Sequence, residues 1–420
     1  MATLPQEFIQ QTRQMMGEER FGRFLQAFDE AAPVSIRLNP LKSAHLTVCE
    51  GEAVPWCRHA FYLPQRPQYT MDPLLHAGCY YVQEPASMFL DEVLRQCLDR
   101  YQELAGPLRA LDLCASPGGK STLLRTALPE GSVLFSNEPL FSRATVLLEN
   151  VTKWGYPNHI VTNCYPCDYR RARMRYDVIL CDVPCSGEGM FRKDEATIRQ
   201  WSQRQVGLCW HLQRQIVTDA WPCLRPGGIM IYSTCTFNTL ENEENIRWLL
   251  SEFDAEVLTV DVRPEWNITG SLLPGFTEPV YRFIPGITRS EGLFVCVLRK
   301  PGTEGKTPRR AVKGKLSCNC PFDLHPMTDD TTADQRSLAE APRRPRTALS
   351  YQQAISYLRG EALILPPDTP RGEVEVCFMG HPLGLVKNIG SRANNLYPKP
   401  WRIKTTHTPT EYEPVLKIAK

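Results

Sequence analysis

The stretch from Tyr176 to Asp194, YDVILCDVPCSGEGMFRKD, decides the fold. Its apolar run, Val178 to Cys181, is typical of a short buried strand. An acid, a proline, a thiol and two glycines follow the strand: Asp182, Pro184, Cys185, Gly187 and Gly189. Open α/β sheets bind ligands in the crevice outside the carboxyl ends of their strands, so chemistry is expected at this turn.

Apolar, β-branched runs alternate with helical patterns from about residue 106 to residue 300. The runs are LRALDLCA, SVLFSNE, HIVTNC, YDVILCD, GIMIYSTC and LFVCVLRK. Between the earlier ones lie the helical patterns KSTLLRTAL, RATVLLENVTKW and the long segment from Ile198 to Leu224. This alternation predicts βαβ units and a doubly wound α/β domain with a mostly parallel sheet.

Three further regions flank this domain. Residues 1–105 begin with an amphipathic helix pattern between Phe8 and Phe28 and continue with the strand-like SIRLNPLKS, which predicts a small α+β region. Residues 301–347 are rich in charge and proline and poor in large apolar side chains, so a linker or long loop is expected. Residues 348–420 predict a compact domain with a helix near its start and a strand in EVEVCFM.

Composition limits the class of protein. A chain of 420 residues with 42% hydrophobic content can bury a large core, and its net charge of +2 leaves nucleic-acid affinity to local basic patches. The start lacks the apolar core of a signal peptide, and no run of 18 apolar residues occurs, so we expect no membrane span and a cytoplasmic protein whose sixteen cysteines are reduced. Cys318, Cys320 and His325 do not make a four-ligand zinc set, so no metal is expected.

The turn after the first strand has the composition of a cofactor loop. Gly118 and Gly119 allow the backbone to approach a ligand, and a helix begins beside them. The phosphate-loop and dinucleotide motifs are both absent, which leaves the related turn that holds S-adenosylmethionine. Glu138 lies at the end of the second strand, where an acid grips the ribose hydroxyls. The alternative is a helix-packing turn followed by an ordinary surface glutamate.

Two cysteines at strand ends indicate covalent catalysis. Carbon 5 of cytosine is too electron-poor to attack a methyl sulfonium, but a thiolate added at carbon 6 converts the ring into an enamine that can. Cys185 and Cys235 are candidates for the thiol chemistry, and Asp182 is a candidate for holding the pyrimidine edge. For either cysteine alone, a buried structural thiol would be the simpler interpretation.

Five motifs that span nearly the whole chain point to one family. They are YYVQEPASM (80–88), DLCASPGGKS (112–121), DVPCSGEGMFRKD (182–194), PGGIMIYSTCTFNTLENEENI (226–246) and HPLGLVKNIGSRANNLYP in the tail. Together they resemble the Sun/Nop-type RNA cytosine-C5 methyltransferases, most closely the RsmF-like ribosomal RNA enzymes. The resemblance implies a Rossmann-like class I methyltransferase domain at 106–300, an N-terminal α+β RNA-binding region and a C-terminal PUA-like RNA-binding domain.

The resemblance also implies roles for individual residues. The nucleophile falls on Cys235, in the TC motif, and the thiol that assists release falls on Cys185, in the PC motif. DNA cytosine methyltransferases attack with the PC cysteine instead. Asp182 would lie between cofactor and target base, and Glu138 would bind the cofactor. The rest of the cofactor site would be Cys114, Ala115, Ser116, Pro117, Gly118, Gly119 and Lys120.

Two positions depart from the family pattern. Val183 stands where the family has alanine, which is expected to change packing more than chemistry. The family also has an acid after the fourth strand that is expected to bind adenine. This acid is not clear in TNCYPCDYR, and Asp168 is the candidate.

RNA is the expected partner, and its target cytosine must be unpaired or flipped out to reach a thiol. Arg37, Lys42 and Arg58 in the first region, and Arg192 and Lys193 after the PCSG turn, are candidate phosphate contacts. Basic and aromatic residues also interleave in the tail: Lys387, Arg392, Tyr397, Lys399, Trp401, Arg402 and Lys404. For Arg192 and Lys193 the alternative is a salt-bridged pair on a turn, and for the tail it is a charged rim around a buried tryptophan.

The sequence therefore predicts a monomeric, S-adenosylmethionine-dependent enzyme that makes 5-methylcytosine in small-subunit ribosomal RNA. The same chemistry on transfer RNA is an alternative, because the catalytic motifs would be shared. A ribosome-assembly factor on a retired methyltransferase fold is a non-enzymatic alternative, and DNA methylation is the weakest.

Overall fold

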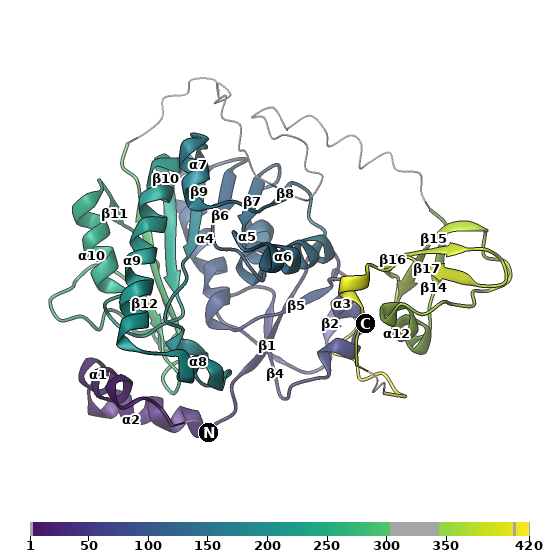
Figure 1. The fold of residues 1–420 in the computed structure, drawn as a ribbon, viewed down its shortest axis with the longest axis horizontal. Coiled ribbons are helices and arrows are strands. Elements are labelled where there is room, and N and C mark those ends of the chain that lie inside the picture. The colour runs from purple at the N-terminus through teal and green to yellow at the C-terminus, as the bar shows by residue number, and fades with distance from the viewer. Residues whose placement is uncertain (1–2, 303–343, 406–408, 420) are drawn as a thin grey trace.

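A computed structural model describes residues 3–302, 344–405 and 409–419, and its centre is an eight-stranded mixed sheet (Figure 1). The strands are β6 (Arg109–Asp112), β7 (Val133–Asn137), β8 (His159–Thr162), β9 (Tyr176–Asp182), β10 (Leu224–Thr234), β11 (Glu256–Val257), β12 (Tyr281–Phe283) and β13 (Leu293–Arg299). Their order is β11-β13-β10-β9-β6-β7-β8, with β12 paired to β13. Strands β10, β9, β6, β7 and β8 are parallel and β13 is antiparallel, so the predicted Rossmann-like α/β class is confirmed.

Helices cover both faces of this sheet, because alternate residues of a strand point to opposite faces. Val178 and Leu180 of β9 pack with α4 and α5, whereas Ile179 packs with α7, α9 and α10. The helices are α4 (Leu90–Arg100), α5 (Gly119–Ala127), α6 (Phe141–Trp154), α7 (Pro166–Arg171), α8 (Glu195–Gln200), α9 (Gln203–Ala220) and α10 (Glu243–Glu252). The long helical pattern expected from residue 198 to 224 is interrupted at Trp201, whose extended backbone ends α8.

The first region contains a small antiparallel sheet and two leading helices. Its elements are α1 (Gln6–Met16), α2 (Glu18–Gln26), β1 (Val34–Leu38), β2 (Leu46–Val48), β3 (Glu52–Ala53), β4 (Ala60–Leu63), α3 (Pro73–His76) and β5 (Tyr80–Val82). The sheet order is β3-β4-β1-β5. The single helix expected at the start is broken at Gly17, whose φ of 75° lies in the left-handed region. Phe8 of α1 and Phe24 of α2 pack edge to face on Phe191 and Phe237 of the central α/β domain, at 5.0 and 5.1 Å between ring centroids.

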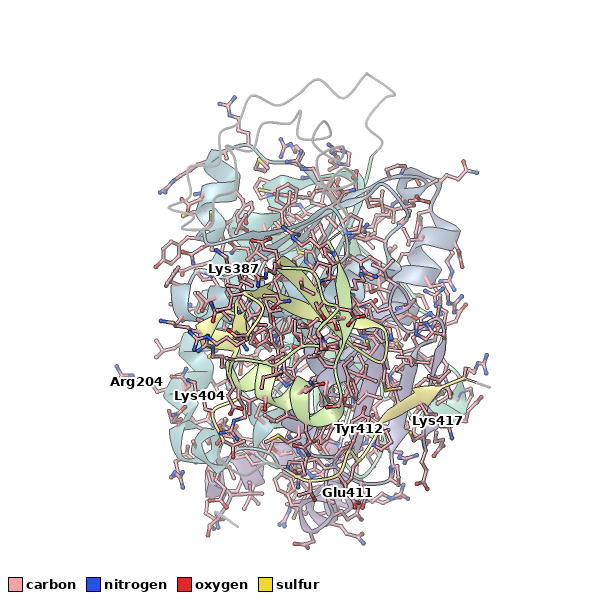
Figure 2. All side chains as sticks on the ribbon, turned by 90° about the vertical axis from the view of Figure 1, so that its right-hand side faces the viewer. Arg204, Lys387, Lys404, Glu411, Tyr412 and Lys417 are labelled. Atoms are coloured by element: carbon pink, nitrogen blue, oxygen red, sulfur yellow. The ribbon has the colours of Figure 1, made fainter. Side chains whose placement is uncertain are left out.

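The C-terminal domain packs against the first region rather than standing alone (Figure 1). Its elements are β14 (Arg346–Ala348), α12 (Tyr351–Arg359), β15 (Gly372–Phe378), β16 (His381–Asn388) and β17 (Ala393–Asn395). The chain then returns, and β18 (Leu416–Ile418) pairs with β2 of the first region. Tyr412, labelled on this returning segment in Figure 2, donates to Asp72 Oδ1 at 3.0 Å, and Tyr351 donates to the Met71 carbonyl at 3.1 Å. Residues 34–82 and the C-terminal domain therefore share one apolar core.

Three further expectations concern the linker, the cysteines and a membrane span. Cys318, Cys320, His325 and most of the expected linker lie outside the described residues. The described cysteines are free thiols apart from Cys164, which is disulfide-bonded, so the expectation of reduced thiols is wrong for that one. Among the described residues, no helix is long and apolar enough to cross a membrane.

Candidate active site

Four parallel strands bring the candidate residues to one edge of the sheet. β10, β9, β6 and β7 are neighbours in that order, so their carboxyl ends lie side by side. The loop after β6 is Cys114–Lys120, and Glu138 follows β7. Asp182 is the last residue of β9, Cys185 lies in the turn after that strand, and Cys235 directly follows β10. These four strand ends therefore meet at the place where the sequence predicts a ligand-binding crevice.

The loop from Cys114 to Lys120 turns sharply into α5. Gly118 has a φ of +114°, which favours glycine, and a Cβ there would come within 3.2 Å of the Leu147 side chain. The helix begins at the next residue, so the backbone N–H groups of its first turn belong to this loop. Burial raises the pKa of the Cys114 thiol well above its usual value, so this cysteine is inert packing rather than a nucleophile.

Glu138 is fixed against the loop by one arginine. Its Oε1 accepts a hydrogen bond from Leu140 N at 3.0 Å, and Arg143 Nε lies 3.4 Å from its Oε2. Arg143 also donates to the Ser116 carbonyl at 3.2 Å, and the Ser116 hydroxyl donates to the Arg143 carbonyl at 3.0 Å. A carboxylate accepts about four hydrogen bonds, so Glu138 keeps capacity for the hydroxyls of a ribose.

Asp182 joins the cofactor loop to β10. Its Oδ2 accepts a hydrogen bond from Lys120 Nζ at 2.9 Å, and its Oδ1 accepts one from Ser233 Oγ at 2.7 Å. Burial lowers the pKa of Lys120, but the charge of Asp182 outweighs burial, so the net shift is upward and Lys120 is cationic. Sequence reasoning placed Lys120 in the loop but missed this ion pair, which crosses between two strand ends.

The two candidate thiols lie together. Cys185 Sγ and Cys235 Sγ are 3.2 Å apart, and both side chains are half-buried, unlike the fully buried strand thiol of Cys181. The hydrogen bond to Cys235, followed by burial, raises the pKa of Cys185 well above its usual value. Cys185 therefore keeps its proton, so in this pair one sulfur is a hydrogen-bond donor and the other is an acceptor.

Glu188 binds the two cysteine loops together. Its Oε2 accepts hydrogen bonds from Phe237 N at 2.8 Å and Asn238 N at 2.9 Å. Its Oε1 accepts from Trp201 Nε1 at 3.0 Å and Asn238 Nδ2 at 3.1 Å. Four donors converge on one buried carboxylate, so the loop after Cys235 is fixed from the loop after Cys185.

Glu241 adds a second link between the same loops. Its Oε2 accepts from Ser186 N at 3.0 Å and Gln213 Nε2 at 2.7 Å, and its Oε1 accepts from Asn238 Nδ2 at 2.8 Å. Burial raises its pKa to about 7. Sequence reasoning named neither Glu188 nor Glu241, and the available signal was an acid three residues beyond Cys185 and another six beyond Cys235.

Asp168 has partners within its own helix. It lies in the first turn of α7, where its Oδ2 accepts a hydrogen bond from Tyr165 N at 2.9 Å. Arg171 lies 3.5 Å from its Oδ1. The carboxylate thus caps α7, and its contact with adenine stays a prediction.

The basic residues expected to contact phosphate in the first region have structural partners. Arg37 is buried and donates to Gln83 Oε1 at 2.8 Å and Thr122 Oγ1 at 2.7 Å. Lys42 donates to two backbone carbonyls, and Arg58 is paired with Asp91 at 3.1 Å. Arg37 and Lys42 thus join the first region to residues 106–300, so the expectation of phosphate contacts is wrong for these two residues.

Of the two basic residues after the PCSG turn, Arg192 and Lys193, only one is available to phosphate. Arg192 forms a 3.0 Å ion pair with Glu291, and the two side chains are only 7% and 3% exposed, so Arg192 is not available to phosphate. Lys193 is exposed. In the tail Tyr397 is buried, whereas Lys387, Arg392, Lys399 and Lys404 are exposed and stay candidate RNA contacts.

A Rossmann-like sheet with a glycine turn after β6, an acid after β7 and polar residues after β9 and β10 defines a class of proteins that bind a nucleotide-like cofactor at the carboxyl ends of their strands. Residues 104–299 match the family described as 16S rRNA methyltransferase RsmB/F. Residues 4–85 match the N-terminal domain of 16S rRNA methyltransferase RsmF, and residues 344–403 match the RsmF PUA domain.

Curated relatives agree with this assignment, and a solved structure shares the fold. The chain is 33% identical to ribosomal RNA small subunit methyltransferase F of Pectobacterium atrosepticum, over 82% of this chain and 70% of the relative. It is 28% identical to the protein of that name from Erwinia tasmaniensis, over 94% and 96% of the two chains. A methyltransferase homologue from Pyrococcus horikoshii shares the fold, with 24% identity, a TM-score of 0.56 and coverage of 71% and 100%. The chain belongs to the RsmF-type family of 16S rRNA methyltransferases.

S-adenosylmethionine is the cofactor of this family, and the described residues suit it. The first turn of α5 offers N–H donors for a carboxylate, and Glu138 offers an acceptor for hydroxyls. Acceptors and donors thus lie on neighbouring loops, as a ligand with both a ribose and an amino-acid group requires.

Proposed function

We propose that this chain methylates carbon 5 of a cytosine in small-subunit ribosomal RNA through a covalent cysteine–cytosine adduct. The observation that carries the proposal is the pair of thiols, 3.2 Å apart, in the crevice that also holds Asp182. A single buried cysteine would be ordinary packing. Two half-buried cysteines at adjacent strand ends, locked by Glu188 and Glu241, form a site built around sulfur.

Cys235 is the nucleophile in this proposal. Its sulfur adds to carbon 6 of the cytosine, and the electron pair of the C5–C6 double bond becomes available at carbon 5. After carbon 5 has gained a methyl group, a base in the crevice removes its proton, and the electron pair of the C5–H bond forms the C5–C6 double bond as the C6–S bond breaks. The electron pair of the C6–S bond returns to the sulfur of Cys235, and the proton held by Cys185 assists that departure.

Asp182 and Lys120 orient the reactants. Asp182 holds the pyrimidine edge, and Lys120 keeps that carboxylate in place from the cofactor loop. The loop 114–120 and Glu138 bind the cofactor, and Asp168 is the candidate for its adenine. When bound, S-adenosylmethionine supplies an electrophilic methyl group.

The flanking regions hold the RNA in this proposal. Residues 1–105 and 348–420 form RNA-binding regions on the catalytic domain at 106–300, with 301–347 as the connection. We propose that the protein acts as a monomer in the cytoplasm. The net charge of only +2, which gives no broad positive field, supports recognition of RNA by shape.

The test is methyl transfer from radiolabelled S-adenosylmethionine to purified small ribosomal subunits, naked 16S rRNA and transfer RNA. We expect label in ribosomal RNA, located to one cytosine by bisulfite sequencing. Label in transfer RNA alone would retain the chemistry and overturn the substrate. Cofactor binding without any label would favour an assembly factor.

A further inference from the structure

The two thiols of the crevice are close enough to form a disulfide. Cys185 Sγ and Cys235 Sγ lie 3.2 Å apart, and a disulfide requires about 2.05 Å, so the sulfurs need to approach by roughly 1 Å. The strands that lead to them, β9 and β10, are parallel neighbours, with Asp182 paired to Ser233. Neighbouring strands lie about 4.8 Å apart, and disulfides join Cα atoms roughly 4.4–6.8 Å apart. The chain segments that lead to the thiols are therefore at a spacing that a disulfide can cross.

The loops that carry the two thiols are fixed against each other. Gly189 N donates to the Cys235 carbonyl at 2.7 Å, and a Cβ on Gly189 would collide with that oxygen, so the loops pack backbone against backbone. Glu188 and Glu241 add the hydrogen bonds between the same loops that are described above. The two sulfurs are therefore held side by side without any movement of a loop.

Cys235 is the sulfur of the pair that is suited to react with an oxidant. Cys185 keeps its proton, so Cys235 is the acceptor and is the sulfur that can carry negative charge. Lys120 lies near enough to interact with it, because burial lowers the pKa of Lys120 whereas Asp182 and, more weakly, Cys235 raise it. A half-buried thiol beside a cation and a second cysteine is typical of oxidation-sensitive pairs.

We propose that Cys185 and Cys235 form a reversible redox switch, in which a peroxide oxidises the pair to a disulfide and stops methyl transfer. The thiolate of Cys235 attacks one oxygen of hydrogen peroxide, the O–O bond breaks, and the sulfur becomes a sulfenic acid. The departing hydroxide takes up the proton that Cys235 had released. The sulfur of Cys185 then attacks the sulfenic sulfur, the S–O bond breaks, and the proton of Cys185 leaves with that oxygen as water. Two thiols are thus oxidised to one disulfide, and one peroxide is reduced to two waters.

The disulfide blocks the proposed reaction because a sulfur that is bonded to Cys185 cannot add to carbon 6 of a cytosine. A dithiol reductant returns both thiols by exchange. In reducing compartments such disulfides are usually transient and report on oxidants. The inactivation rests on the proposed role of Cys235, whereas formation of the disulfide rests on the geometry of the two thiols alone.

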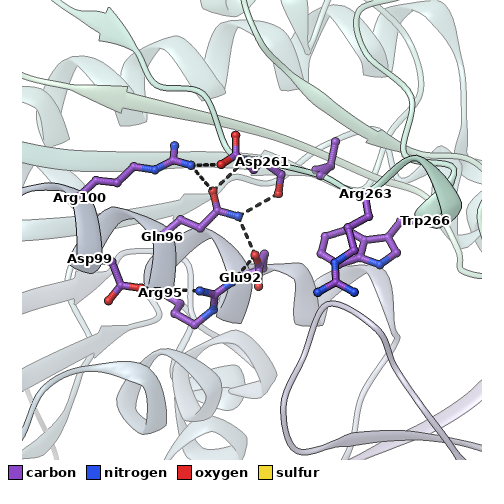
Figure 3. A pocket seen from close by; sticks show the side chains of 9 residues that line it. Glu92, Arg95, Gln96, Asp99, Arg100, Asp261, Arg263 and Trp266 are labelled. Atoms are coloured by element: carbon purple, nitrogen blue, oxygen red, sulfur yellow. Dashed lines mark hydrogen bonds and ion pairs between the residues drawn. The ribbon is translucent and has the colours of Figure 1, made fainter.

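A cavity outside the crevice carries no comparable chemistry. It has about 360 Å³ and lies between α4 and residues 261–266 (Figure 3). Its acids are already paired, because Arg95 pairs with Glu92 and Asp99, and Arg100 pairs with Asp261. Its lining therefore offers an arriving ligand no free carboxylate, whereas the crevice holds two free thiols in contact.

The test exposes the reduced, purified chain to increasing hydrogen peroxide, blocks the remaining thiols with N-ethylmaleimide and digests the protein without reductant. We expect mass spectrometry to find the peptides of Cys185 and Cys235 joined to each other at the dose at which methyl transfer to 16S rRNA falls. Residual activity should equal the fraction of protein without this link, and dithiothreitol should restore the activity. Cys49→Ser, which removes a half-buried thiol outside the crevice, is the matched control and should be inactivated at the same dose.

A second variant tests the role of the partner thiol. In Cys185→Ser no thiol can capture the sulfenic acid, so Cys235 should be oxidised further to the sulfinic acid. This product is a mass gain on the peptide of Cys235 that dithiothreitol does not remove. The melting temperature, measured before oxidation, should match that of the wild type and would show that the variant is folded.

The outcomes separate the switch from the proposed reaction. Loss of activity without the joined peptides would overturn the switch, as would a link that forms only at doses that have already oxidised Cys49. A link that forms while methyl transfer continues undiminished would overturn the inactivation and would also remove Cys235 as the nucleophile. A link that forms in a protein without any methyl transfer under reducing conditions would support the oxidisable pair and count against the proposed reaction alone.

Discussion

The loops of the catalytic crevice and the basic residues around it differ in how they are held. In the crevice, Cys185 and Cys235 come from turns that directly follow neighbouring strands, so strand order alone places them together. Outside it, Arg37 and Arg192 face partners far away in the sequence, Thr122 and Glu291.

This difference shows which kinds of function a sequence displays. A residue at the end of a parallel strand has its position fixed by the sheet, whatever surrounds it. A basic residue binds phosphate only if no acid or carbonyl has already engaged it, and that depends on long-range packing. Five predictions test the contrast, beginning with the largest effect.

Replacing Cys235 with alanine should remove turnover, by at least about a thousandfold, because no other group supplies the bond to carbon 6. Calorimetry should show unchanged affinity for S-adenosylmethionine. Cys49→Ala, another half-buried free thiol, is the matched control and should retain activity. Measurable turnover in Cys235→Ala would remove it as the nucleophile.

Replacing Cys185 with alanine should trap the enzyme on its substrate. Addition by Cys235 proceeds, but release lacks the proton held 3.2 Å away, so a covalent protein–RNA adduct accumulates. A denaturing gel with labelled RNA shows the adduct as a shifted band. The double variant with Cys235→Ala should lose that band, and its absence in Cys185→Ala would contradict the role.

Replacing Glu188 with glutamine should lower kcat about ten- to one-hundredfold with little change in KM, because the new amide N–H₂ would face two of the four donors that the carboxylate accepts from and displace the loop of Cys235. The split between kcat and KM, measured on ribosomal RNA, separates positioning from binding. Glu244→Gln, which changes an acid paired with Arg247 on α10, is the control. Equal loss in both variants would refute the positioning role.

Arg192→Ala should affect stability, whereas Lys193→Ala should affect RNA binding. The first leaves Glu291 buried without its partner, which should cost about 3–5 kcal/mol of unfolding free energy at pH 8. The second should leave stability unchanged and reduce the salt dependence of RNA binding by about one charge. Urea unfolding and binding titrations measure the two effects. Loss of RNA affinity in a folded Arg192→Ala, measured beside Lys193→Ala, would restore Arg192 as an RNA contact.

The smallest effect concerns pH. Burial raises the pKa values of Asp112, Glu241 and Glu291 to about 7, from ordinary values of about 4. Between these values the folded protein binds more protons than the unfolded chain, so the free energy of unfolding falls as pH rises from about 4 to 7. Urea unfolding should give greater stability at pH 5 than at pH 8. Glu291→Gln should reduce the difference, whereas the exposed Glu52→Gln should not.

The sequence predicted the elements of the catalytic domain well because each has a local cause. The apolar run in β9 and the glycines before α5 require no partner to be recognised. The break at Gly17 was missed because an amphipathic pattern continues across it. The return of β18 to β2 was missed because edge pairing between distant strands leaves no periodic signal.

The sequence by itself determined the sheet, the family and the positions of Cys185, Cys235, Asp182 and Glu138 at its edge, because strand order and turn composition are local properties. Only the tertiary structure decided how those groups are charged and held. The proton on Cys185 and the Lys120 ion pair depend on burial and on contacts between loops far apart in the chain. Desolvation and hydrogen bonding act through space, so a linear pattern does not record them.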